Sequence, residues 1–295
     1  MRSGFVSFIG RPNAGKSTLL NQILKTKVAI TSDKPGTTRN IIEGIYNDED
    51  SQIVFVDTPG IHKPVNKLGQ ILNKGAYYSI DDVDIICLIM DVKTKLGKGD
   101  KFVIDKLKDI NKPVILILNK IDGLSKDEIF LKINEYKDLY DFKEIVPISA
   151  LKNKNIDELI KVIKEYLPDN IKYFENDTIT NRSVEFMIAE IVREKILWLT
   201  KEEVPHSVTC VLEKIIKDKD KHIINVAIIV DRDALKRIII GKNGSMIKKI
   251  GMLAREDLEK LLNTKIYLDL YVKTIEKWRD REKYLSEFNF NDFTE

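Results

Sequence analysis

The chain has 295 residues, of which 43% are hydrophobic and 32% charged, with a net charge of +3. This length predicts two domains, and the composition is that of a globular protein. No run of about 18 apolar residues occurs, so we expect no membrane-spanning helix. An apolar strand is predicted from residue 5, so we expect no signal or transit peptide. The two distant cysteines indicate a reduced, cytoplasmic setting.

The first 170 residues alternate short apolar runs with helical patterns. Strands are predicted at 5–9, 41–46, 53–56, 85–90, 114–118 and 144–148, and helices at 17–24, 65–79, 101–108, 127–139 and 156–166. This alternation predicts an α/β fold with a mostly parallel, doubly wound sheet over 1–170. The acidic and polar stretch 171–182 is predicted to be a linker.

The second part has a different order of elements. Helices are predicted at 183–199, 234–240 and 245–262, and strands at 208–212, 223–230 and 266–272. The order α-β-β-α-α-β predicts a separate α+β domain over 183–280, followed by a C-terminal tail, 281–295.

A phosphate-binding loop follows the first strand and opens a helix. It consists of Gly10, Arg11, Pro12, Asn13, Ala14, Gly15, Lys16 and Ser17, and Thr18 extends the expected contacts. The glycines let the backbone wrap a phosphate, and the amides at the helix start act as anion donors. Lys16 places a cation on the outer phosphates, and the Ser17 hydroxyl is an expected Mg²⁺ ligand.

Two further segments complete an expected metal site and a switch. The first is Asp57-Thr58-Pro59-Gly60 at the end of a strand, where Asp57 would hold Mg²⁺ and the Gly60 N–H would reach the terminal phosphate. The second is the stretch with paired threonines, in which Thr38 is the preferred Mg²⁺ ligand and Thr37 the alternative. Because such a threonine binds the metal only with the γ-phosphate present, these segments, with Ile61, are predicted to switch.

The base is predicted from two loops that follow buried strands. Asn119-Lys120-Ile121-Asp122 places a carboxylate that can accept from N1–H and the 2-amino group of guanine, a donor pair that adenine lacks. Ser149-Ala150 offers a backbone N–H to guanine O6. GTP and GDP are therefore the expected ligands, and Asp122 argues against a metabolic ATPase.

These motifs together resemble the Era family, within the translation-factor-related GTPases. The segments GRPNAGKSTLLN, PGTTRN, DTPGIH, NKID and SAL follow that family's order. The second part is similar to the family's type II KH domain, in segments that begin at Val184, Ile238 and Tyr267. One departure is Gly36, where family members often carry Gln.

The resemblance implies a monomeric GTP-hydrolysing switch that binds 16S rRNA near its 3′ end and acts in assembly of the 30S subunit. It also implies a cytoplasmic protein with peripheral association at the inner face of the cell membrane, and a K⁺ ion near the phosphates, held by Asn13. Ile61 stands where Ras-like proteins carry a water-orienting Gln. We therefore expect slow hydrolysis without an activating partner.

An RNA clamp is predicted in the second part. Gly241-Lys242-Asn243-Gly244 joins two helices, and the glycines would let a single-stranded RNA backbone approach closely. Lys248 and Lys249 would join Lys242 in contacting phosphates. The alternative is a non-ribosomal signalling GTPase whose second domain contacts protein or membrane; the intact loop favours RNA.

Overall fold

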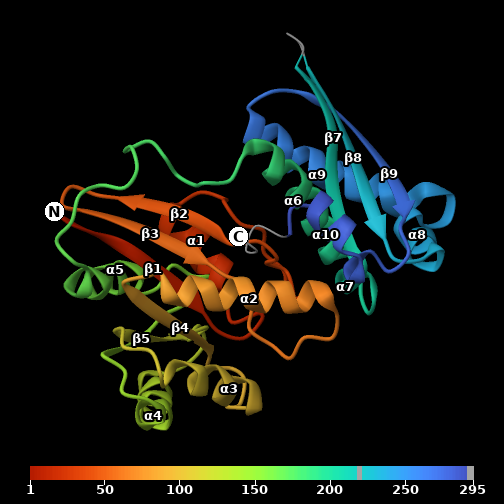
Figure 1. Ribbon diagram of the computed structural model, residues 1–295. Helices are drawn as coiled ribbons and strands as arrows, with labels where there is room; N and C mark the ends of the chain where they lie inside the picture. Colours follow the sequence, from red (N-terminus) through yellow and green to blue (C-terminus); the bar gives the residue numbers. More distant parts are fainter. Residues whose placement is uncertain (218–220, 291–295) are drawn as a thin grey trace. The chain divides into compact units, whose positions relative to one another are not determined.

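The computed structural model describes residues 1–217 and 221–290 and divides into two compact units (Figure 1). The first unit comprises 1–29, 38–64 and 72–181, and the second comprises 30–37, 65–71 and the described chain from 182 onward. Within the expected tail, 291–295 lie outside the described residues. No helix in the described ranges is long and apolar enough to cross a membrane.

The first unit is built on a six-stranded sheet with the strand order β2-β3-β1-β4-β5-β6. The strands are β1 (Arg2–Ile9), β2 (Ile42–Asn47), β3 (Ser51–Asp57), β4 (Ile85–Asp91), β5 (Val114–Asn119) and β6 (Glu144–Pro147). All neighbours pair in parallel except β2 and β3, which form an antiparallel hairpin. The short turn permits the hairpin, whereas each parallel pair needs a longer crossover.

Helices cover this sheet. They are α1 (Lys16–Leu24), α2 (Lys67–Asp81), α3 (Lys98–Leu107), α4 (Lys126–Tyr136), η1 (Lys137–Leu139) and α5 (Ile156–Tyr166). Ala76 of α2, Val103 of α3 and Tyr136 of α4 share one hydrophobic core with Leu88 and Leu116 of the strands. The predicted α/β fold is confirmed, and the parallel strands place the loops that follow β1, β3, β5 and β6 at one edge of the sheet.

The stretch that was expected to be a linker runs beside the sheet. The Ile45 N–H of β2 donates to the Ile179 carbonyl at 2.9 Å. The buried Gln52 side chain accepts from the N–H groups of Tyr173 and Phe174 at 2.7 and 3.0 Å, and donates to the Phe174 carbonyl at 2.9 Å. This stretch is therefore hydrogen-bonded to the strands of the first unit and is part of that unit.

The second unit contains a three-stranded sheet in the order β7-β8-β9. Its elements are α6 (Val184–Leu199), α7 (Val204–Ser207), β7 (Val208–Lys217), β8 (His222–Val230), α8 (Asp233–Ile240), η2 (Lys242–Gly244), α9 (Ser245–Leu262), β9 (Ile266–Thr274), η3 (Trp278–Asp280) and α10 (Glu282–Glu287). β7 and β8 are antiparallel, whereas β8 and β9 are parallel. The predicted α-β-β-α-α-β order is confirmed, with the short α7, η3 and α10 added.

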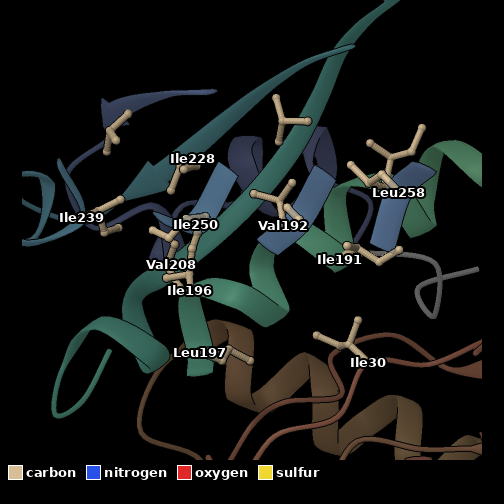
Figure 2. Close-up of a cluster of buried hydrophobic side chains, with 14 of the residues drawn as sticks. Ile30, Ile191, Val192, Ile196, Leu197, Val208, Ile228, Ile239, Ile250 and Leu258 are labelled. Atoms are coloured by element: carbon tan, nitrogen blue, oxygen red, sulfur yellow. The ribbon is translucent and has the colours of Figure 1, made fainter. Parts of the chain in front are cut away.

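One hydrophobic core joins the helices of the second unit to its sheet (Figure 2). Val192 and Ile196 of α6, Ile239 of α8 and Ile250 of α9 are buried against alternate residues of β8. Ile30, which lies between α1 and β2 in the sequence, is buried in this same core. The segment 30–37 thus packs with the second unit.

Candidate functional site

The loop between β1 and α1 is shaped by residues with positive φ. Gly10, Asn13 and Gly15 have φ values of 149°, 65° and 102°. The Lys16 ammonium points back at the loop and donates to the carbonyls of Gly10 and Arg11 at 3.3 and 3.2 Å. Burial lowers the pKa of Lys16 to about 8, although Asp57 opposes the shift. The buried Lys16 ammonium, which is held by backbone carbonyls, can form strong charge-assisted hydrogen bonds to phosphate oxygens.

Arg11 and Thr18, near the two ends of the phosphate-binding loop, lie in different surroundings. The Arg11 guanidinium forms an ion pair with Asp100 of α3 at 3.0 Å, which holds the loop to that helix. Thr18 lies half-buried in the first turn of α1. The contact of Arg11 with α3 was not visible from the sequence, because it depends on the packing of a distant helix.

Oxygen atoms from three loops gather beside Lys16. The Ser17 hydroxyl donates to Asp57 Oδ2 at 2.5 Å and lies 2.8 Å from Thr38 Oγ1. Asp57 is fully buried, and burial raises its pKa to about 6 against the opposing effects of Lys16 and Ser17. Its Oδ1 atom has no hydrogen-bond partner among the described residues. Hydroxyl and carboxylate oxygens with an unused acceptor fit Mg²⁺.

The two adjacent threonines point to different partners. Thr38 reaches Ser17, whereas the Thr37 hydroxyl donates to the Lys34 carbonyl at 2.7 Å and lies 2.7 Å from Ser32 Oγ. Of the two candidates, the structure places only the Thr38 hydroxyl in the oxygen cluster.

The loop after β3 lies against the phosphate-binding loop. A Cβ at Gly60 would lie 2.6 Å from the Pro12 nitrogen, so only glycine fits this approach. The Thr58 hydroxyl donates to the Phe8 carbonyl at 2.8 Å. Pro59 lies between these two buried residues. The Ile61 side chain is buried in the core beneath α2 and α3, so it offers no polar group to a water molecule.

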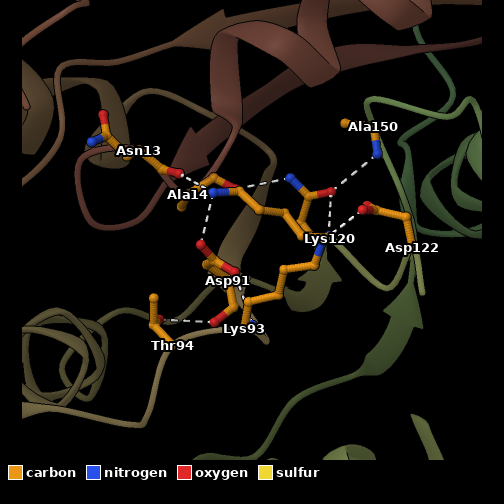
Figure 3. Close-up of polar contacts among 9 residues, drawn as sticks. Asn13, Ala14, Asp91, Lys93, Thr94, Lys120, Asp122 and Ala150 are labelled. Atoms are coloured by element: carbon orange, nitrogen blue, oxygen red, sulfur yellow. Dashed lines mark hydrogen bonds and ion pairs between the residues drawn. The ribbon is translucent and has the colours of Figure 1, made fainter. Parts of the chain in front are cut away.

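Asn119 joins three loops of the expected base site. Figure 3 labels Lys120, Asp122 and Ala150 of this site. Its amide donates to the Ala14 carbonyl at 2.8 Å, and its oxygen accepts from the Ala150 N–H at 3.0 Å. The sequence predicts that a backbone N–H of Ser149-Ala150 donates to guanine O6. In the structure the Ala150 N–H donates to Asn119 Oδ1. The buried Asn119 therefore fixes the spacing between the phosphate-binding loop and the base-reading loops.

Lys120 and Asp122 have charged partners that the sequence did not indicate. Lys120 Nζ donates to the Asn13 carbonyl at 2.8 Å and to Asp91 Oδ2 at 2.7 Å. Lys93 and Ser149 donate to Asp122, and these hydrogen bonds hold the pKa of that carboxyl below its usual value. Strand register was the missing signal, since Asp91 of β4 pairs directly with Asn119 of β5.

Polar residues of α6 hold the segment that precedes Thr38. Glu194 accepts from the Thr31 N–H at 2.9 Å, and Trp198 Nε1 donates to the Thr31 carbonyl at 2.8 Å. The Arg193 guanidinium donates to the Thr37 carbonyl. Arg193 and Glu194 are buried, which is unusual for charged residues unless they are paired. In the sequence, the adjacent charged residues Arg193 and Glu194 interrupt the apolar pattern of α6, and this interruption could have indicated that they bind another segment.

The loop between α8 and α9 contains three residues with positive φ. Gly241, Asn243 and Gly244 have φ values of 71°, 52° and 75°. A Cβ at Gly241 would also lie 2.7 Å from Met246 Cβ. Lys242 is exposed at the tip of this loop. Lys248 and Lys249 are exposed on the first turns of α9.

A groove of about 320 Å³ lies next to this loop, between α9 and β9. It is lined by Ile247, Lys248, Gly251, Met252, Arg255, Tyr267, Leu268, Asp269 and Leu270. Gly251 has no side chain, which leaves space on the groove floor. A Cβ at this position would lie 3.5 Å from Leu270 Cδ1. The groove combines an apolar floor with cationic and aromatic walls, which suits unstacked bases with adjacent phosphates.

The chain matches two families by sequence. Residues 5–120 match the family described as 50S ribosome-binding GTPase, and residues 203–279 match the KH domain family. GTPase Era of Clostridioides difficile (strain 630) is 50% identical over 294 residues, which cover 99% of each chain.

Two solved structures are similar over almost the whole chain. One is a variant of Aquifex aeolicus Era bound to GDP·AlF4⁻, and the other is Era in complex with MgGDPNP and nucleotides 1506–1542 of 16S ribosomal RNA. Each is 42% identical, has a TM-score of 0.94, and covers 98% of this chain and 99% of its own. This chain belongs to the Era family of GTPases and consists of an α/β GTPase domain followed by a KH domain.

Proposed function

We propose that this GTPase is a switch whose bound nucleotide controls the binding of 16S rRNA, near its 3′ end, by the KH domain. The proposal rests on the contacts of two adjacent residues, Thr37 and Thr38. Thr38 lies at the oxygen cluster of the phosphate site, whereas the preceding Thr37 is hydrogen-bonded to Arg193 of the second unit. A ligand that moves Thr38 also pulls on the chain that α6 holds.

The nucleotide site follows from the loops at the sheet edge. The phosphates would lie against the amides of Gly10–Thr18 and Gly60, next to Lys16. Ser17, Thr38 and Asp57 would hold Mg²⁺, which when bound neutralises charge on the phosphate oxygens. Asn119, Lys120, Asp122, Ser149 and Ala150 would surround the guanine. Asp57 Oδ1 accepts no hydrogen bond from the part of the chain that the structure describes, which supports the metal assignment.

Hydrolysis is the attack of water on the γ-phosphoryl group. Lys16 stabilises the charge that develops on the phosphate oxygens. Because Ile61 is buried and apolar, this chain supplies no group at that position to orient the water. We expect slow turnover by the isolated protein and faster turnover when a partner completes the site.

A monovalent cation is a further proposed ligand, based on the family resemblance of Asn13. This residue has a positive φ of 65° in the phosphate-binding loop, and its carbonyl accepts from Lys120. GTP turnover should be faster in K⁺ than in Na⁺, and Asn13→Ala should reduce the difference. Equal rates in the two salts, with and without RNA, would remove K⁺ from the account.

The RNA site is proposed at the Gly241–Gly244 loop and the groove beside it. Lys242, Lys248 and Lys249 would contact phosphates, and the groove between α9 and β9 would hold bases. The Era complex with 16S nucleotides 1506–1542 supports this choice of RNA. It favours rRNA over the alternative of a signalling GTPase with a protein-binding or membrane-binding second domain.

The cellular role rests on the family resemblance. We propose a monomer that acts in assembly of the 30S subunit in the cytoplasm and associates peripherally with the inner face of the cell membrane. Co-sedimentation with 30S particles and with vesicles of anionic lipid, each in GTP and in GDP, separates the two locations.

Crosslinking to RNA tests the RNA assignment. Crosslinks of the full chain to the 3′ region of 16S rRNA should be stronger with a non-hydrolysable GTP analogue than with GDP. Gly241→Asp should abolish them, because it places a side chain and a negative charge in the clamp. Asn263→Asp adds the same charge at the other end of α9, where φ is also positive, and should retain them. Equal crosslinking in all conditions would contradict the proposal.

A further inference from the structure

Both carboxylate oxygens of Asp122 accept strong hydrogen bonds from this chain. Ser149 Oγ donates to Oδ1 at 2.8 Å. Lys93 Nζ donates to Oδ2 at 2.6 Å (Figure 3). The two donors differ in their surroundings. Ser149 is fully buried, whereas 47% of the Lys93 side chain is exposed to solvent. Lys93 is therefore the donor that can leave.

Guanine makes demands on the same two oxygens. Its N1–H and its 2-amino group both donate to one carboxylate, in the plane of the base. An ammonium on Oδ2 occupies an acceptor direction that one of these donors needs. The base must displace Lys93 from Asp122 or share the oxygen at poorer geometry.

The position of Lys93 is fixed by the turn after β4. Asp91 Oδ1 accepts from the Lys93 N–H at 2.9 Å, and the Asp91 carbonyl accepts from Thr94 Oγ1 at 3.0 Å. Asp91 Oδ2 also binds Lys120 Nζ. One aspartate thus shapes the turn that carries Lys93 and holds the lysine of the base-reading motif. The hydrogen bonds of this turn therefore hold the Lys93 backbone where its side chain reaches Asp122.

We propose that Lys93 competes with guanine for Asp122. The ion pair lowers the affinity for guanine nucleotides and promotes their release, because Lys93 takes the place of the departing base. The proposal rests on the assignment of Asp122 as the base-reading carboxylate. It makes Lys93 a residue that sets nucleotide affinity without contacting the phosphates.

The test compares two lysines of one turn. Lys93→Met should bind a fluorescent GDP about two- to fivefold more tightly than Lys95→Met, the range expected for loss of a partly exposed ion pair. Lys95 is exposed and forms no ion pair within the described chain, so its substitution controls for the loss of one positive charge from this turn. The GDP dissociation rate should fall by a similar factor. At about 1 M salt, the difference should shrink because the ion pair is screened.

Two outcomes separate the proposal from its premise. Equal or weaker GDP binding by Lys93→Met than by Lys95→Met would overturn the role of Lys93. Native-like GDP binding by Asp122→Ala would instead overturn the assignment of the guanine site. Both lysine variants should unfold at the same temperature as the native chain. This control excludes a change in packing, which would alter the melting temperature as well as the GDP affinity.

Discussion

Asp57 shows at the level of one residue how the site is prepared for a metal. Its carboxylate is fully buried, yet within residues 1–217 and 221–290 only one of its oxygens has a donor, the Ser17 hydroxyl. Burial raises its pKa to about 6, whereas the unfolded chain has the ordinary value of 3.8. The stability that this group contributes is fully present below the unfolded pKa and is lost as the pH rises through the folded pKa.

Asp57→Asn should remove this pH dependence. Without metal or nucleotide, the native chain should lose up to roughly 3 kcal/mol relative to the variant between about pH 4 and pH 7. Urea unfolding of both proteins across this range measures the difference. Addition of Mg²⁺ at pH 7 should stabilise the native chain more than the variant. A difference that does not change with pH would contradict the burial argument.

Sequence motifs predicted which residues gather at the sheet edge, because the carboxyl ends of parallel strands converge there. They did not predict the partners of those residues. Asp91 and Lys93 carry no motif, and their importance depends on the register of β4 with β5. The choice between Thr37 and Thr38 likewise depended on the path of the backbone, which the sequence left open.

The loop and first turn of α9 form the element that should determine the salt dependence of RNA binding. Each lysine–phosphate contact on single-stranded RNA contributes about 0.7 to the slope of log affinity against log salt. Lys242→Met should lower that slope by about this amount. Lys260→Met, at the exposed far end of α9, should leave it unchanged. An unchanged slope in Lys242→Met would exclude Lys242 from the phosphate contacts.

Helix α6 is the element that holds the segment 30–37. Trp198→Phe removes one N–H donor to the Thr31 carbonyl, worth about 1 kcal/mol. Amide hydrogen exchange in this segment should therefore become about fivefold faster. Trp278→Phe removes the equivalent donor to Ser207 and serves as the matched control. Unchanged exchange in Trp198→Phe would show that α6 does not hold the segment.

Most elements were predictable because their hydrophobic periods are clear. α5 (Ile156–Tyr166) has the predicted bounds, whereas β7 extends to Lys217 instead of ending at 212. The extension is largely exposed although it contains Ile215 and Ile216, and a register shift between Leu212 and Lys214 interrupts its alternation. Backbone pairing with β8 therefore defines it. α7 and α10 are too short to show a helical period.

In the whole molecule, the stretch between the units is hydrogen-bonded to the first unit up to Asn181. Gln52→Leu would leave the N–H groups of Tyr173 and Phe174 without their acceptor, at about 1–3 kcal/mol for each. Trypsin should then cleave after Lys172 faster than in the native chain. Gln70→Leu, the same change on an exposed face of α2, should not alter the rate. Equal cleavage in Gln52→Leu would show that this docking is weak.

The pattern of elements predicted an α/β part and an α+β part. It did not predict that 30–37 and 65–71 pack with the second unit. Those contacts join residues far apart in sequence, such as Lys67 with Glu282 and Thr31 with Glu194, so no local pattern encodes them. We propose that these contacts couple nucleotide binding to RNA binding.

This coupling is measured by the affinity of the protein for RNA in two nucleotide states. An oligonucleotide from the 3′ region of 16S rRNA should bind the full chain with Mg²⁺ and a non-hydrolysable GTP analogue about 5- to 150-fold more tightly than with GDP. By linkage, the RNA should raise the preference for the analogue over GDP by the same factor. Equal RNA dissociation constants in the two states would contradict the account.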